Sequence, residues 1–220
     1  MPSGFSGSPK FLKGALVVFE TIVPVPTNLI VFQYNPETMS RSFEQRGIDF
    51  DPGWNSGDTF HIQFPPVESF QVTVELDSAD QLEKSNPLAR ATGLHPTLAA
   101  LELLLYPSSA TLILNKALAL VGSAFITPPQ VPTVLFIWGP ARVVPVRVAS
   151  VAVTEQAFDQ LLNPIQAKVD LGLRALTIQE TQAVGAPFET LAIVQLIAKE
   201  VMARLNVVNS AEQITGMLPF

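Results

Sequence analysis

Apolar and polar residues alternate strictly from Ile165 to Leu173, and this segment sets the class of fold. Ile165, Ala167, Val169, Leu171 and Leu173 are apolar, and the residues between them are polar, charged or glycine. Because successive side chains of a β-strand point to opposite faces, this period of two predicts a strand with one buried and one solvated face. Such a pattern is typical of an antiparallel sheet that covers a core on one side.

Two further strands are expected before it. Val134 to Trp138 is a β-branched and aromatic run that ends at Gly139-Pro140, a pair that favours a turn. The next strand is predicted from Arg142 to Val153, with alternating valines whose phase shifts by one residue at Ala149-Ser150. Such a shift predicts a β-bulge or a bend. The residues from Glu155 to Pro164 are interpreted as a long connection that ends in a turn.

Strands are also expected in the first part of the chain. Lys13 to Glu20 and Asn28 to Tyr34 are apolar runs separated by Pro24 and Pro26, and they predict a hairpin. Glu68 to Leu76 alternates in the same way as the strand near the C-terminus and predicts another half-buried strand.

Helical spacing appears in the second and last thirds of the chain. A short helix is expected to open at Pro87, and Pro96 to Tyr106 carries leucines at three-to-four spacing. Residues 107–132 are interpreted as an apolar insertion without a clear structure, for which a helix is one option. Thr177 to Ala186 is expected to be a linker, and Phe188 to Leu205 is expected to be a terminal helix.

Together these segments predict a mainly β (α+β) fold. The strands are expected to form two packed antiparallel sheets or a partly closed barrel with one helix across it, followed by a C-terminal helix. Residues 1–12 are expected to be a flexible N-terminus and residues 13–178 the β domain, with a long loop at residues 40–66. Residues 179–220 are expected to be a linker and a helical extension.

Charge and residue content exclude several classes of function. The 220-residue chain has a formal net charge of −6, so it offers no basic field for nucleic acid or for an anionic membrane. It has no cysteine, which excludes disulfides, thiolate metal sites and a cysteine nucleophile. The apolar run at Ala15 to Phe19 is too short for a secretion signal, and Ala110 to Ile126 is too interrupted to span a bilayer.

The residues needed for catalysis or metal binding are scarce. The chain has two histidines, His61 and His95, and neither lies beside a nucleophilic serine or a carboxylate in a recognisable pattern. An acidic group lacks the spacing of a calcium loop and is interpreted as a solvated face; its members are Glu68, Glu75, Asp77, Asp80 and Glu83. We therefore expect a protein that is not an enzyme, with no catalytic residues, no metal site and no cofactor.

Two sets of apolar residues are candidates for binding a partner protein. The loop at residues 40–66 contains Phe50 and Trp54, which are apolar side chains in a long glycine-containing segment. The terminal helix has an apolar stripe that needs a surface to cover it, either on its own domain or on a partner. The stripe consists of Leu191, Val194, Ile197, Val201 and Leu205.

Several short motifs resemble one known family. The segment Phe32-Gln33-Tyr34-Asn35-Pro36-Glu37, the strand ending in Glu75-Leu76-Asp77, and the helix ending in Leu105-Tyr106-Pro107 are similar to the tube-type domain of contractile injection systems. The later Phe136 to Gly139 strand, Phe158-Asp159, and the turn Asn163-Pro164-Ile165-Gln166-Ala167 resemble the same domain. The resemblance covers residues 13 to 178.

The resemblance implies a structural role in a phage-tail-like particle. It implies a baseplate subunit, six copies to a ring, that joins the inner tube and spike hub to the baseplate wedges. It also implies assembly in the bacterial cytoplasm, without nucleic acid or membrane insertion. The alternative within the family is an inner-tube or tube-initiating protein. Many family members of this length carry a C-terminal LysM domain, whereas this chain has a helix and a tail after Ala183. A hydrolase or carbohydrate-binding domain is the rival from another class.

Overall fold

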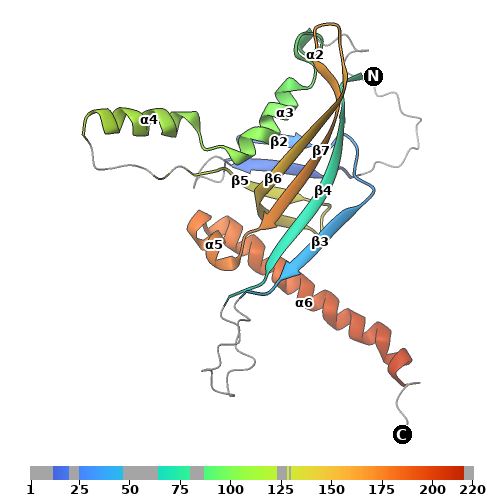
Figure 1. Cartoon of the computed structure of the whole chain (residues 1–220). Coiled ribbons are helices and arrows are strands. Elements are labelled where there is room, and N and C mark those ends of the chain that lie inside the picture. The colour runs from blue at the N-terminus through green and yellow to red at the C-terminus, as the bar shows by residue number, and fades with distance from the viewer. Residues whose placement is uncertain are drawn as a thin grey trace, which may run out of the picture.

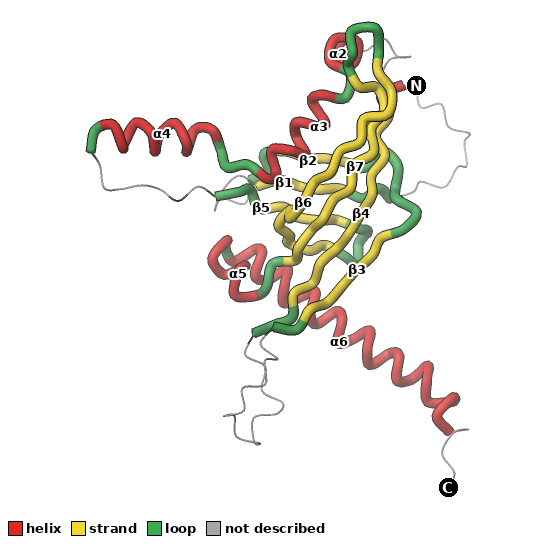
Figure 2. The backbone as a smooth tube through the Cα atoms, in the orientation of Figure 1, coloured by secondary structure: helices red, strands yellow, loops and turns green. Residues whose placement is uncertain are grey.

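One open antiparallel sheet forms the centre of the protein. The computed structural model describes residues 12–19, 25–46, 64–79, 87–122, 128 and 130–215. Seven strands pair in the order β2-β1-β5-β6-β7-β4-β3 (Figure 1; Figure 2). The fold is mixed α/β, with this single sheet and several helices. The strands are β1 (Ala15–Phe19), β2 (Asn28–Val31), β3 (Met39–Glu44), β4 (Val67–Asp77), β5 (Thr133–Ile137), β6 (Val143–Phe158) and β7 (Pro164–Ala175).

The helices differ in how closely they approach the sheet. α3 and the 3-10 turn η2 lie against it, and their Leu98, Leu101 and Leu104 join the core. α4 extends away from the sheet, and α6 crosses one end of the sheet and continues beyond it (Figure 1). The helices are α2 (Pro87–Thr92), α3 (His95–Glu102), η2 (Leu103–Leu105), α4 (Ser109–Leu120), α5 (Ile178–Val184) and α6 (Ala186–Thr215).

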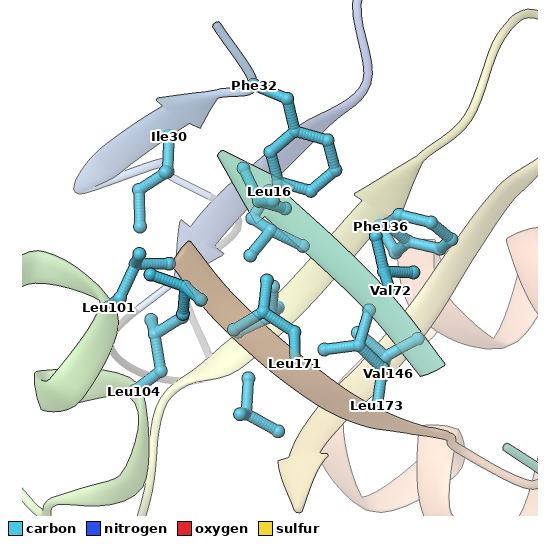
Figure 3. Close-up of a cluster of buried hydrophobic side chains, with 14 of the residues drawn as sticks. Leu16, Ile30, Phe32, Val72, Leu101, Leu104, Phe136, Val146, Leu171 and Leu173 are labelled. Carbon is cyan, nitrogen blue, oxygen red and sulfur yellow. The ribbon is translucent and has the colours of Figure 1, made fainter. Parts of the chain in front are cut away.

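The core lies on one face of the curved sheet, where Leu101 and Leu104 meet side chains from β1, β2 and β7 (Figure 3). Phe70 of β4 and Phe136 of β5 have ring centroids 5.5 Å apart, although β6 and β7 lie between their strands in the sheet. This contact shows that the sheet is strongly curved, but its two edge strands, β2 and β3, do not pair with each other. The predicted two packed sheets or partly closed barrel is therefore not confirmed, since the strands form one open sheet.

The predicted face assignment of the strand near residue 169 is confirmed. In β7, Val169 and Leu171 are fully buried, whereas Lys168 and Asp170 are exposed. The register between β6 and β7 shifts between Val148 and Ser150, which confirms the predicted bulge at that position. β1 and β2 pair in antiparallel fashion, as the predicted hairpin requires.

The predicted connection from Glu155 to Pro164 is wrong for half of its residues, since Glu155 to Phe158 and Pro164 belong to strands and only residues 159–163 form the connection. β6 continues to Phe158, because Ala157 pairs with Gln166 and Phe158 with Pro164 on β7. The connection is a tight turn in which the Asp159 carboxylate accepts hydrogen bonds from the backbone of Leu161 and from the backbone and side chain of Asn163. These hydrogen bonds with Asn163 lower the pKa of Asp159.

The predicted loop at residues 40–66 begins with a strand. β3 pairs with β4 from Met39 to Glu44, although its residues are mostly polar and exposed. Edge strands need little apolar content, so its sequence lacks the usual strand signal. Phe50 and Trp54, which were predicted to bind a partner, lie outside the described residues. Residues 1–11 of the predicted flexible N-terminus also lie outside them.

Two predictions about the C-terminal part need correction. The predicted linker from Thr177 to Ala186 contains α5, and α6 extends to Thr215 instead of ending at Leu205. Within the predicted insertion, residues 109–120 form α4, which is the helical option given for that segment. Gly185 joins α5 to α6 at a φ of 138°, a conformation that favours glycine.

Candidate interaction surface

The first turn of α6 fixes the helix to the end of the sheet. Phe188 is 3% exposed, and its ring meets Phe19 of β1 edge to face with centroids 5.1 Å apart. Such a buried aromatic pair stabilises the junction by area burial and by its geometry. α6 is therefore attached to its own domain through Phe188, a residue that is not part of the predicted apolar stripe.

The short helix α5 supports this junction with a capping box. The Thr177 hydroxyl accepts a hydrogen bond from the Glu180 backbone, and the Glu180 carboxylate accepts one from the Thr177 backbone. Glu180 also binds Arg174 of β7 at 2.5 Å. Partial burial raises the pKa of Glu180, but the hydrogen bonds from Thr177 and Arg174 outweigh it and hold the pKa below its ordinary value.

A second contact holds α6 further along its length. Lys199 Nζ lies 2.5 Å from Glu68 Oε2 on β4, and Arg41 of β3 approaches the same carboxylate at 3.7 Å. The two cations also lie over the Phe43 ring, at 5.4 Å and 5.0 Å from its centroid. The side chain of Glu68 is only 11% exposed, so these partners replace most of its contact with water.

We expect Glu68→Gln to weaken this attachment. The substitution keeps the size of the side chain but leaves Lys199 and Arg41 without their counter-charge, which should lower the free energy of unfolding by about 1 to 2 kcal/mol. Urea denaturation would measure the loss. Glu200→Gln, at an exposed position of α6, is the matched control and should change stability by less than about 0.5 kcal/mol. Equal losses in both variants would contradict a specific role for Glu68.

The apolar stripe predicted on the terminal helix is largely uncovered. Val194 is 49% exposed, Ile197 51%, Val201 48% and Leu205 53%, whereas Leu191 is half-buried. From Val194 onward the stripe lies on a side of α6 turned away from Phe188 and Lys199, whereas Leu191 is three residues from Phe188 and shares its face. Sequence reasoning did not identify Lys199 as a docking residue. Only its long-range partner Glu68 could have revealed this.

α4 is a second apolar surface, and sequence reasoning did not identify it as one. None of its residues is buried, and Leu112, Ile113 and Leu114 are 48%, 68% and 53% exposed. Leu120 and Val121 at its end are 82% and 78% exposed. The signal was present in the composition, because residues 109–120 contain a single charged residue, Lys116. A helix that is apolar all round is normally buried.

The motif from Phe32 to Glu37, part of the family resemblance, connects strands. The Asn35 side chain accepts a hydrogen bond from Gly14 and donates one to the Leu12 carbonyl, and Gln33 accepts one from the backbone of Asp77. These bonds tie the segment after β2 to the start of β1 and to the end of β4. The motif therefore acts here as a structural clamp.

The turn motif from Asn163 to Ala167, also part of the family resemblance, joins the β6–β7 connection to the helices. Leu94 donates a backbone hydrogen bond to the Pro164 carbonyl, and the Asn163 side chain reaches the Ala91 carbonyl. Gly93, with a φ of 53°, lies so close to Pro164 that a Cβ atom would collide with its carbonyl oxygen. The turn therefore positions α2 and α3 beside the sheet.

The described residues offer no assembled metal site. No group of three or more histidine, aspartate or glutamate side chains gathers among them. His95 is exposed at the start of α3, and His61 lies outside the described residues. Of the predicted acidic group, Glu68 is engaged by Lys199 and Asp77 by Gln166.

Comparisons with protein-family models and with curated protein sequences find no significant match for this chain. A test of length and composition finds no single described helix able to cross a membrane. The pair His95–Leu105 and Ser109–Leu120, bent by 51°, passes that test when the two segments are taken together.

Proposed function

We propose that this chain is a structural baseplate subunit of a contractile injection particle. In this proposal its curved sheet is a domain of the tail-tube type, and six copies form a ring that joins the inner tube and spike hub to the baseplate wedges. The subunit carries no catalytic function and assembles in the bacterial cytoplasm before it enters the particle. The alternative is an inner-tube or tube-initiating protein of the same particle.

The uncovered part of α6 is the observation that carries this proposal. The helix is attached through Phe188 and Lys199, and beyond Lys199 every described side chain up to Val207 is exposed. Burying the exposed half of a valine or leucine side chain is worth about 1 kcal/mol. Several such residues on one projecting helix favour a protein that is completed by a partner.

The uncovered α4 supports the same class of function. It extends from a different part of the fold than α6 (Figure 1), so one partner surface is not expected to cover both helices. A subunit that connects two different neighbours needs two such surfaces. This favours the adaptor between hub and wedge over a protein that only stacks into a tube.

The family motifs support the proposed domain type through their structural roles. Asn35 and Asn163 each bind backbone groups of separate elements. These contacts hold the frame of the fold, as expected for a domain whose task is to keep a fixed shape in an assembly. The carboxylates of Asp159 and Glu180, whose pKa values are lowered, are likewise engaged in turn and cap hydrogen bonds.

A chain that ends at Lys199 tests the proposal and separates it from the alternative. This truncation removes the projecting part of α6 but retains Phe188 and the contact with Glu68, so the domain should fold. Expressed with the other particle genes, the truncated adaptor should give particles without an attached baseplate. A tube-initiating protein should instead still start a tube. Electron microscopy of purified particles distinguishes the two outcomes. Normal contractile particles would contradict the adaptor role of the helix and would leave the tube-initiating alternative in place.

A further inference from the structure

A cleft lies where β6 runs past the end of its pairing with β5. β5 pairs with β6 up to Val146, whereas β6 continues past that residue and pairs with β7. The cleft has a volume of about 580 Å³ and lies beside Arg147. Its apolar wall is formed by Leu105 of η2 and Val131 before β5, while the side chain of Val148, which also borders the cleft, is buried in the core. This volume falls within the range of roughly 300 to 1,000 Å³ that is usual for small-molecule sites.

The charged residues of this cleft are mostly positive. Arg46, Arg147 and Arg174 line it together with a single carboxylate, Glu180. Three guanidinium groups and one carboxylate leave two positive charges, in a chain whose formal net charge is −6. The cleft is therefore positively charged, although the protein as a whole is negatively charged.

Glu180 is already engaged and does not neutralise Arg147. One of its oxygens binds Arg174, and the other accepts hydrogen bonds from the backbone and hydroxyl of Thr177. Arg147 lies directly opposite Arg174 on the neighbouring strand. Like charges at opposed positions of a sheet destabilise it. An anion beside Arg147 would offset the charge of this arginine, which Glu180 does not pair.

We propose that the cleft binds a phosphate-type oxyanion carried on a small organic group. Arg147 and Arg46 hold the oxyanion, because the planar guanidinium presents paired donors that match phosphate oxygens. The wall of Leu105 and Val131 receives the organic group. This site is independent of the proposed role in particle assembly, since it uses neither α4 nor the projecting part of α6.

Thermal unfolding and calorimetry of the purified full chain test this site with two probes, inorganic phosphate and phenyl phosphate. Both should raise the Tm above that in sodium chloride of equal ionic strength, and phenyl phosphate should bind at least tenfold more tightly. Arg147→Gln should weaken the binding of both probes at least tenfold. Without either probe this variant should be at least as stable as the wild type, because the repulsion with Arg174 is gone.

Arg204→Gln, at an exposed position on α6, is the matched control and should bind both probes like the wild type. The proposal is overturned if sodium chloride raises the Tm as much as phosphate does. It is also overturned if Arg147→Gln binds phosphate normally. A lower Tm of that variant in chloride would then show that Arg147 is a structural residue. Equal affinity for the two probes would overturn the assignment of the apolar wall.

Discussion

Val169→Asp is expected to unfold the protein. Val169 is fully buried in β7 and lies between Val74 of β4 and Val153 of β6. The substitution removes an apolar side chain from the core and places an unpaired carboxylate there, at a cost of more than about 4 kcal/mol. This loss is comparable to the whole stability of many domains. Circular dichroism and the yield of soluble protein would measure it.

Lys168→Asp is the neighbouring control on the exposed face of the same strand. Lys168 lies opposite Glu75 of β4, so the substitution places two carboxylates side by side at a cost of up to about 1 kcal/mol. The protein should remain folded, with a small decrease in Tm. If both variants lost soluble protein to the same extent, the strand would tolerate no substitution on either face, and burial would not explain the effect at Val169.

The double substitution of Val194 and Val201 by glutamate is expected to leave the free subunit folded but to remove it from particles. Both side chains are about half exposed in the subunit, at 49% and 48%, and glutamate is a good helix former. The free energy of unfolding should therefore change by less than about 0.5 kcal/mol. In the proposed assembly the same positions are buried, where two unpaired carboxylates would cost several kcal/mol.

The assay for this double variant is expression in the full gene cluster, followed by electron microscopy and by detection of the subunit in purified particles. We expect particles that lack the subunit and an assembled baseplate. Ala203→Glu adds a negative charge at an exposed position of α6 outside the stripe, and it should be incorporated normally. Normal particles from the double variant would refute the role of the stripe in attachment, and a misfolded subunit would show that the stripe belongs to the core.

The sequence alone determined the features that depend on local periodicity. A period of two fixed the buried face of β7, and a one-residue shift in that period located the bulge between Val148 and Ser150. Helical spacing located α3 and most of α6. These predictions succeed because the geometry of a strand or helix decides which neighbouring side chains share a face, whatever the rest of the fold does.

The tertiary structure decided the features that depend on distant residues. β6 extends to Phe158 because β7 pairs with it, and the polar residues of β3 form a strand because β4 supplies the ladder. The same holds for the candidate site. Spacing defined the apolar stripe of α6, but the side on which the helix docks was set by Glu68, which is 131 residues away from Lys199 in the sequence. A pattern shows that a face is apolar, and only the folded chain shows whether its own residues cover that face.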